Sequence, residues 1–339
     1  MCRNLISALK KPKFLNIIFI PLLFFSVYSS FSLGGNEKNH VILRAADDHE
    51  LTYPTTQGLL KMAELIKKWS HGRISVKVYP SAQLGSERET IELTRKGIID
   101  INRVNINPVT QIVPEFKILA LPYIFRSAGH LHHVVDGEIG KELMEYMVSK
   151  GLIGLGFYDS GQRSFYNSIR PVRTAADLKG LRLRVQKAEI VKDMVRALGA
   201  VPIPMAFEEV YTGLKTGVLD GAENNFPSWV TKGHFEIARF YTADEHSRAP
   251  EIILFSKITW ERLSVQDRQI IRKAAAESIP YQRRLWSIMV KHSIEKAIAA
   301  GCIIATNVDK ESFFNAMGPV YKKHARNLEQ LAESIRNVE

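Results

Sequence analysis

The sequence predicts an α/β fold made of two hinged domains. Short aliphatic runs alternate along the chain with amphipathic stretches of helical length, which is typical of strands and helices that follow one another. About 305 residues remain after an N-terminal targeting segment, enough for two domains that each bury a core. No repeat, low-complexity tract or Pro/Ser-rich linker occurs. The chain must therefore pass between the two domains on ordered segments.

The first part of the chain alternates strands with helices. Residues 74–79 alternate apolar and polar side chains and end at Pro80, as a half-buried strand does. Residues 55–70 carry an apolar stripe at helical spacing, and Gly97 follows a second helix at 86–96. Strands are predicted at 41–46, 74–79, 98–107 and 152–158.

The later part continues this pattern and ends in helices. Further strands are predicted at 181–186, 218–222, 252–256 and 302–306, with an extended piece at 202–204 and a polar loop between 158 and 181. Helices are predicted at 208–216, 267–300 and 310–337. We expect each domain to be a mixed sheet flanked by helices, with the long C-terminal helices packing across both domains.

Residues 1–34 are typical of a signal peptide that is removed on export. Arg3, Lys10, Lys11 and Lys13 form a basic start, and residues 14–25 form an apolar core too short to span a bilayer comfortably. Small residues follow this core and suit cleavage. An uncleaved N-terminal anchor is the alternative.

Charge and cysteine content narrow the possible functions. Removal of the four basic residues of the signal leaves 42 Lys and Arg against 35 Asp and Glu, a net charge of +7. This excess is diffuse, and no basic tract with interleaved aromatic residues occurs, so we expect binding of anionic small molecules and not of nucleic acid. Cys302 becomes the only cysteine, which excludes an intrachain disulfide.

No catalytic or cofactor motif occurs in the chain. The segment 156–161 lacks the Gly-x-Ser-x-Gly spacing, and there is no phosphate loop, dinucleotide fingerprint or zincin motif. His130, His132, His133 and Asp136 resemble metal ligands, but only two pairs of them share a helical face. We therefore predict no enzyme activity, no cofactor and no metal site.

Arg184 stands out because it lies inside a predicted strand. By the period-two rule Leu181, Leu183 and Val185 line one face of this strand, and Arg182, Arg184 and Gln186 line the other. Arg182 lies nearer the start of the strand and is expected in solvent. Arg184 lies near the carboxyl end, where open α/β sheets bind ligands and where a guanidinium suits a carboxylate. A structural ion pair is the alternative.

Polar side chains recur where the predicted strands end. The set is Asp48, His49, Glu87, Asn105, Asp159, Arg163, Arg184, Gln186, Asn224 and Asn225. Each has an ordinary explanation as a helix cap, a turn residue or a surface ion pair. Their repeated position favours one shared crevice. Two arginines, paired amides and an acid suit a ligand with a carboxylate at one end and hydroxyl groups at the other.

Several segments together resemble the DctP family, the solute receptors of tripartite ATP-independent periplasmic (TRAP) transporters. They include Pro122-Tyr-Ile-Phe125, Gly161-Gln-Arg-Ser164, residues 177–186, residues 208–217 and Asp220-Gly-Ala-Glu-Asn224, and the resemblance extends from about Val41 onward. It implies a two-domain clamshell of the periplasmic binding protein type. Such a receptor binds an organic anion between its domains and performs no chemistry.

The resemblance also implies roles for individual residues. Arg184 matches the strand arginine that forms the main salt bridge to the ligand carboxylate, and Arg163 matches a second arginine. Asn224 matches a ligand-contacting asparagine, and His246 a histidine beside the pocket.

A narrower resemblance points to members that bind hexuronates such as glucuronate and galacturonate. It depends on His49 with Tyr53-Pro54-Thr55, Arg103-Val-Asn105, Tyr158-Asp-Ser-Gly161, Asn224-Asn225 with Pro227-Ser228, and Glu245-His246-Ser247. Glu50 and Phe226 depart from this subgroup, in which proline and tryptophan are usual at these positions. These two differences bear on which stereoisomer of the sugar the protein would bind.

The implied protein is a periplasmic monomer with a ligand cleft between two domains. We expect residues 40–160 plus 250–288 in the first domain and 161–249 plus 289–337 in the second. Its partners would be the small and large TRAP membrane subunits, which are DctQ- and DctM-like. The alternatives are a receptor for another sugar acid or a C4-dicarboxylate, a receptor that presents its ligand to a sensor kinase, and a uronate-acting enzyme that uses Glu87, Asp159 and His246 as acid and base groups.

Overall fold

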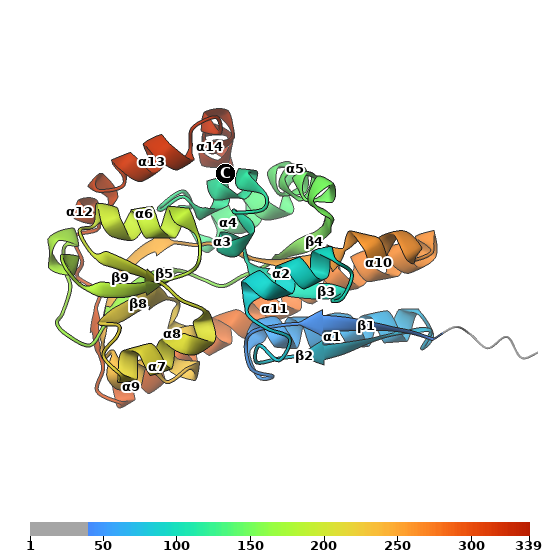
Figure 1. The fold of residues 1–339 in the computed structure, drawn as a ribbon, viewed down its shortest axis with the longest axis horizontal. Coiled ribbons are helices and arrows are strands. Elements are labelled where there is room, and N and C mark those ends of the chain that lie inside the picture. Colours follow the sequence, from blue (N-terminus) through green and yellow to red (C-terminus); the bar gives the residue numbers. More distant parts are fainter. Residues whose placement is uncertain (1–39) are drawn as a thin grey trace, which may run out of the picture. The chain divides into compact units, whose positions relative to one another are not determined.

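The computed structural model describes residues 40–339, so the signal peptide predicted at residues 1–34 lies outside the described residues. Two mixed sheets with helices around them make up this part of the chain (Figure 1). Within residues 40–339 no helix is both long and apolar enough to cross a membrane.

The first sheet has the strand order β2-β1-β3-β10-β4. Its strands are β1 (Val41–Ala46), β2 (Ile74–Tyr79), β3 (Ile101–Asn105), β4 (Leu152–Tyr158) and β10 (Glu251–Ser256). β1 runs parallel to β2 and β3, whereas β10 runs antiparallel to β3 and β4. Helix α1 (Pro54–Trp69) buries Leu59, Met62 and Ile66, which recur at helical spacing.

The second sheet has the order β11-β9-β5-β8-β6-β7. Its strands are β5 (Arg163–Asn167), β6 (Arg182–Val185), β7 (Val201–Pro204), β8 (Gly221–Asn224), β9 (Phe240–Ser247) and β11 (Ile303–Ala305). β6 runs parallel to β7 and β8, and β5 runs antiparallel to β8 and β9. Around this sheet lie α6 (Glu189–Ala197), α7 (Val210–Lys215), α8 (Phe226–Thr231) and α9 (His234–Ile237).

The chain passes between the sheets from β4 to β5, from β9 to β10, and along α11 (Val265–Ala299). Helix α11 lies against α1 and β4 beside the first sheet and against α8 beside the second (Figure 1). Gly161, in the β4–β5 crossing, has a φ of +63°, and a Cβ there would lie 2.8 Å from the Trp286 Nε1 atom of α11. This crossing therefore needs glycine for both its backbone conformation and its close approach.

One apolar cluster joins the two sheets. It includes Val104 and Leu254 from the first sheet and Phe165 and Leu183 from the second, all fully buried. Two smaller clusters pack α1 and α11 against the first sheet and α7, α8 and α9 against the second. The continuous core holds the ends of the strands, and hence the side chains that follow them, in fixed positions.

The α/β fold with two mixed sheets is confirmed, but some elements were predicted wrongly. Strand β5 falls where a polar loop was expected, and β9 was not predicted. The single helix expected at 310–337 is instead α12 (Lys310–Asn315), α13 (Gly318–His324) and α14 (Glu329–Asn337). Pro319 lies in the first turn of α13 and cannot continue α12, and Asn327, with a φ of +67°, lies between α13 and α14.

Candidate functional site

Polar side chains from both sheets line two adjoining cavities, which we call the cleft. Its first wall consists of Asp48, His49, Glu87, Arg103, Asn105 and Glu251, which belong to the first sheet and the segments that follow its strands. Its second wall consists of Arg163, Arg184, Gln186, Phe207, Asn224, Asn225 and Ser228. Nine of the ten predicted strand-end residues belong to these walls.

Helix starts and strand ends position several of these groups. Asn105 ends β3 because its side-chain oxygen accepts a hydrogen bond from the Asn107 N–H (3.0 Å) and begins α3 (Ile106–Val109). Asn225 begins α8 in the same way, by accepting from the Ser228 N–H at 2.8 Å. Helix α2 (Glu87–Arg95) starts with Glu87, which lies in the first turn where a carboxylate is favoured.

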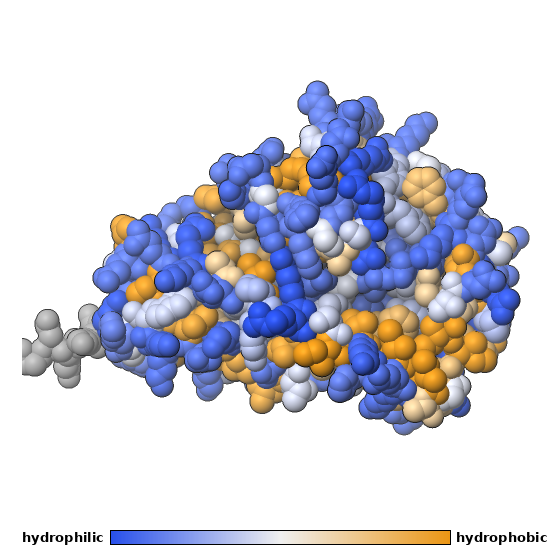
Figure 2. Space-filling model, turned by 180° about the vertical axis from the view of Figure 1, so that it is seen from behind, coloured by the Kyte–Doolittle hydropathy of each residue, from blue (hydrophilic) through white to orange (hydrophobic). Residues whose placement is uncertain are grey.

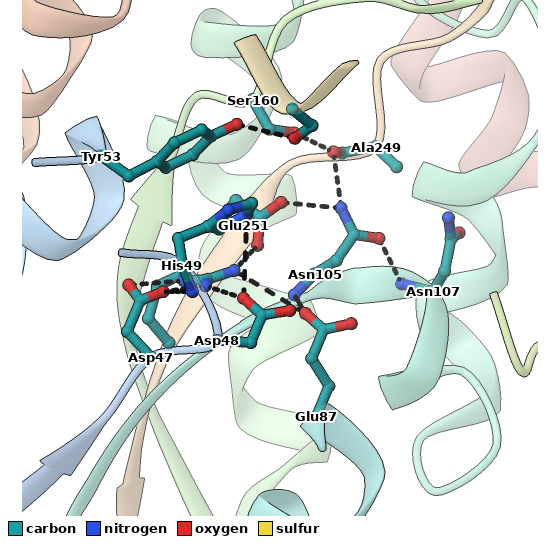
Figure 3. Close-up of polar contacts among 12 residues, drawn as sticks. Asp47, Asp48, His49, Tyr53, Glu87, Asn105, Asn107, Ser160, Ala249 and Glu251 are labelled. Carbon is teal, nitrogen blue, oxygen red and sulfur yellow. Dashed lines mark hydrogen bonds and ion pairs between the residues drawn. The ribbon is translucent and has the colours of Figure 1, made fainter. Parts of the chain in front are cut away.

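Arg103 is the centre of the first wall and is 1 % exposed. Its Nε donates to Asp47 (3.0 Å) and its Nη1 to Glu251 (2.6 Å), and its Nη2 donates to Asp47 and Asp48. Glu87 lies 3.7 Å from Nη1. Figure 3 shows the four carboxyl groups of Asp47, Asp48, Glu87 and Glu251 turned toward one another beside Asn105. Three carboxyl groups of the first wall, together with the buried Asp47 beside it, thus surround one guanidinium.

This arrangement affects ionisation in the first wall. Burial raises the pKa of Glu87 well above its ordinary value, and the neighbouring Asp48 and Glu251 raise it further. Burial also opposes ionisation of Asp48, but the charge of Arg103, with a smaller contribution from Lys232, holds the pKa of Asp48 below its ordinary value. Burial lowers the pKa of His49 well below its ordinary value, so the imidazole is neutral and stacks on Tyr53 with the rings 3.7 Å apart.

The second wall contains a row of alternating charges behind Arg163. The Arg163 Nε and Nη2 atoms donate to the Glu223 carboxylate at 2.5 and 2.9 Å, and Nη1 donates to Asn224 at 3.0 Å. Burial opposes the charge on His246, but Asp244 (2.8 Å) and Glu223 (3.5 Å) raise the pKa of His246 to about 9. Arg163, Glu223, His246 and Asp244 therefore largely neutralise one another.

Arg184 differs from the other two cleft arginines. It is 3 % exposed, and among residues 40–339 its side chain forms a single hydrogen bond, from Nε to the Met205 carbonyl at 2.9 Å. Its guanidinium carbon lies 5.7 Å from the centre of the Phe207 ring. Among residues 40–339 it forms no ion pair, and burial lowers its pKa. The second wall thus presents an uncompensated cation to the cleft.

Three side-chain amides offer N–H groups beside Arg184. The oxygen atoms of Asn224, Asn225 and Gln186 accept hydrogen bonds from Arg163, Ser228 and Asn107, respectively. Their NH₂ groups have no recorded partner within the described part of the chain. The second wall is therefore rich in donors, whereas the first wall is rich in acceptors.

Polar contacts connect the walls across the cleft. The Tyr53 hydroxyl, at the start of α1, lies 2.9 Å from the Ser228 hydroxyl on α8. Asn107 donates to Gln186 at 2.6 Å. Lys232 lies 3.7 Å from Glu50. Gln186, predicted to contact ligand, thus also links the two halves of the molecule.

Two predicted ligand-binding residues lie outside the cleft. His246 is buried behind Arg163 and does not line either cavity. Asp159 lies 2.9 Å from His132 and lines a separate groove, together with Trp286, Val290 and Ile294 of α11. Figure 2, which views the molecule from behind, shows apolar side chains gathered on part of that face.

His130, His132 and His133 each contact a different partner in the structure. His130 contacts the Ile335 carbonyl, His132 contacts Asp159, and His133 contacts the Glu339 carbonyl. Within residues 40–339 no group of three or more His, Cys, Asp or Glu side chains is placed to hold a metal ion.

Sequence reasoning missed the charge partners of the cleft arginines. Asp47, Glu223 and Glu251 were not among the predicted site residues, yet they pair with Arg103 and Arg163. Glu251 begins β10, and Arg163 begins β5, so antiparallel strands bring their first residues to the edge where the parallel strands end. An acidic residue at the start of a predicted antiparallel strand is the signal that could have revealed Glu251.

Replacement of Arg103 should destabilise the protein strongly. Arg103→Gln leaves the buried carboxyl groups without their cation, so we expect the free energy of unfolding at pH 7 to fall by about 3–5 kcal/mol in urea titrations. Arg196→Gln removes an exposed partner of Asp193 and serves as the control, with an expected loss of about 0–1 kcal/mol. Equal losses in the two variants would contradict the central role of Arg103.

The charge on His246 should make stability depend on pH. Its pKa is about 9 in the fold and about 6.5 when unfolded, so the contribution is fully present below pH 6.5 and is lost as pH rises through 9. We expect the difference in unfolding free energy between wild type and His246→Gln to shrink by on the order of 3 kcal/mol between pH 6 and pH 10. The exposed His292→Gln should show no such change. A constant difference for His246→Gln would contradict the raised pKa of His246 in the folded protein.

Comparison with known proteins places the chain among bacterial solute receptors. Among curated proteins it is 38% identical over 291 residues to a solute-binding protein of Chromohalobacter salexigens, covering 86% of this chain and 87% of that one. It is 30% identical over 280 residues to the 2,3-diketo-L-gulonate-binding periplasmic protein of Escherichia coli, covering 82% and 85% of the two chains.

Solved structures agree with this placement. A TRAP periplasmic solute-binding protein of a Bradyrhizobium species, in complex with α/β-D-galacturonate, is 44% identical with a TM-score of 0.85 and covers 87% of this chain and 99% of its own. A TRAP protein of Chromohalobacter salexigens with bound D-glucuronate is 39% identical with a TM-score of 0.86, covering 88% and 100%.

The family assignment follows from the extent of these matches. Residues 46–328 match the family described as bacterial extracellular solute-binding protein, family 7. The resemblance read from the sequence motifs is confirmed, and the clamshell fold with it. The chain belongs to the DctP family of periplasmic solute receptors of TRAP transporters.

Proposed function

We propose that this receptor binds a hexuronate of the D-galacturonate or D-glucuronate type in the cleft, with the ligand carboxylate on Arg184. The observation that carries the proposal is the burial of Arg184 without an ion-pair partner among the described residues. A buried guanidinium is unfavourable unless it is paired, and a planar carboxylate can accept two parallel hydrogen bonds from it. Charge-assisted bonds of this kind contribute about 1.5–3 kcal/mol each.

Arg163 has a supporting part in this proposal. Its Nε, both N–H groups of Nη2 and one of Nη1 already donate to Glu223 and Asn224. One N–H of Nη1 is left to reach a ligand. Arg184, with its free Nη atoms, is the main anchor of the carboxylate, and Arg163 contributes one further donor.

The remaining polar groups suit hydroxyl groups. Each ligand hydroxyl can accept from the free amides of Asn224, Asn225 and Gln186 and donate to the carboxyl groups of Asp48 and Glu87. The similar structures with bound galacturonate or glucuronate are 34–44% identical to this chain, whereas one bound to D-erythronate and the 2,3-diketo-L-gulonate-binding relative are each 30% identical. These identities favour a uronate over another sugar acid.

The site geometry favours binding without chemistry. The family consists of solute receptors. Glu87, Asp159 and His246, the acid and base groups of the alternative enzyme, do not share a cavity, because only Glu87 lines the cleft. We further propose that the protein is exported by a cleaved signal peptide, acts as a monomer in the periplasm, and delivers its ligand to the small and large TRAP membrane subunits.

Removal of the Arg184 guanidinium should weaken ligand binding. We expect Arg184→Ala to raise the dissociation constant for D-galacturonate or D-glucuronate by at least about 30-fold, which corresponds to about 2 kcal/mol, in isothermal titration calorimetry. Arg184→Lys should also bind more weakly, because an ammonium group cannot form the bidentate pair.

Arg182→Ala is the matched control for this measurement. Arg182 lies on the same strand, but its side chain is 46% exposed and pairs with Asp220, so its loss should leave the affinity unchanged. Unchanged affinity in Arg184→Ala, or tight binding of C4-dicarboxylates with no response to uronates in a thermal-shift panel, would refute the proposal.

A further inference from the structure

The two walls of the cleft carry opposite net charge. In the second wall the charges of Arg163, Glu223, His246 and Asp244 largely cancel, which leaves the positive charge of Arg184. In the first wall Asp48, Glu87 and Glu251, with the buried Asp47 beside them, surround Arg103 alone. A ligand that spans the cleft therefore meets a cation at one end and an excess of carboxyl groups at the other.

The other cations near the first wall offset its carboxyl groups little. Arg88 and Lys187 line one cavity of the cleft with Asp48 and Glu87, but Arg88 is exposed and Lys187 partly exposed, so water screens their charges. His49, 3.7 Å from Asp48, is neutral because burial lowers its pKa. Lys232 interacts with Asp48 at longer range, but its ammonium group is shared with Glu50 at 3.7 Å. Burial raises the pKa of Glu87, and the neighbouring carboxyl groups of Asp48 and Glu251 raise it further, so an additional negative charge is unfavourable at this wall.

Two carboxyl oxygens of the first wall remain available. Asp48 uses one oxygen to accept from Arg103, and Glu87 uses one to accept from the Asn105 N–H at 2.7 Å. The second oxygen of each has no recorded partner within residues 40–339, and both residues line both cavities of the cleft. A hydroxyl group can donate to such an oxygen, whereas an ionised carboxylate has no hydrogen to donate. A ligand carboxylate is repelled by Asp48, which stays ionised, and would bring a further charge beside Glu87, where burial already disfavours ionisation.

We propose that Asp48 and Glu87 are specificity determinants that admit only ligands whose end remote from the carboxylate is uncharged. This inference rests on the proposed function and narrows its substrate class to monocarboxylic sugar acids. A hexuronate meets the condition with its hydroxyl groups. An aldarate, which carries a second carboxylate in place of the anomeric carbon, does not.

The test compares galacturonate with galactarate, its diacid, by isothermal titration calorimetry at pH 7. Wild-type protein should bind galacturonate at least about 100-fold more tightly, because like charges in a buried interface are strongly disfavoured. Asp48→Asn and Glu87→Gln are measured singly and as the double variant. In each, the ratio of the galactarate to the galacturonate dissociation constant should fall by at least about 10-fold, because galactarate binding improves relative to galacturonate binding.

The exposed Glu92→Gln on the same helix α2 is the control, since Glu92 pairs only with Arg95 on the surface, and it should keep the wild-type ratio. Thermal unfolding of each variant shows that it is folded. If Asp48→Asn does not fold, because Asp48 supports Arg103, the partly exposed Glu87→Gln still provides the comparison.

Three outcomes contradict a proposal, and they can be told apart. Equal binding of the two acids by wild-type protein overturns this inference and leaves the proposed function intact. The inference is also overturned if the ratio of the two dissociation constants is unchanged in the Asp48 and Glu87 variants, or if galactarate binding stays undetectable in them. Absence of any uronate binding contradicts the proposed function. The inference is then tested by comparing whichever monocarboxylic acid does bind with the diacid of the same carbon skeleton.

Discussion

The burial of three arginines is the constraint on which the cleft depends. Arg103, Arg163 and Arg184 are each at most 3 % exposed, and a guanidinium withdrawn from water needs charged or hydrogen-bonding partners. The protein supplies carboxylates to Arg103 and Arg163. It supplies only a backbone carbonyl to Arg184. Two of the arginines therefore build the walls, and on the proposed function the third binds the ligand carboxylate.

Arg103 and Arg163, which pair with carboxylates, hold neighbouring strands together at the end of each sheet where the backbone hydrogen bonds between the strands stop. Arg103 on β3 joins the residues that follow β1 to Glu251 at the start of β10. Arg163 on β5 joins Glu223 on β8, and Glu223 in turn faces His246 on β9. Each charge cluster thus spans three neighbouring strands. It fixes the positions of the polar side chains that face the cleft, which backbone hydrogen bonds alone would not do.

Local features of the sequence were enough to predict the fold class and the placement of Arg184 in the cleft. Its charge partners were not predictable, because they depend on strand register. Arg163 meets Glu223 because β5 and β8 are antiparallel with Phe165 opposite Glu223, and nothing near Arg163 in the sequence indicates this pairing. Strand β5 itself was predicted as a loop, since its polar residues are buried against charged partners and hydropathy alternation fails there. The resemblance placed His246 beside the pocket, whereas in the structure it lies behind Arg163, 3.5 Å from Glu223.

The division of donors and acceptors between the walls links ligand binding to closure of the cleft. Amide and guanidinium donors belong to the second sheet, and carboxyl acceptors belong to the first. A carboxylate alone would satisfy Arg184 and leave the first wall without a partner, whereas a neutral sugar would leave Arg184 buried and unpaired. On the proposed function, a uronate satisfies both walls at once and favours the form in which they face each other. The hydrogen bonds between Tyr53 and Ser228 and between Asn107 and Gln186 then further stabilise the closed state, which the bound ligand already favours. Closure without ligand would bury the Arg184 charge at a cost of several kcal/mol, which favours an open receptor until the correct anion arrives.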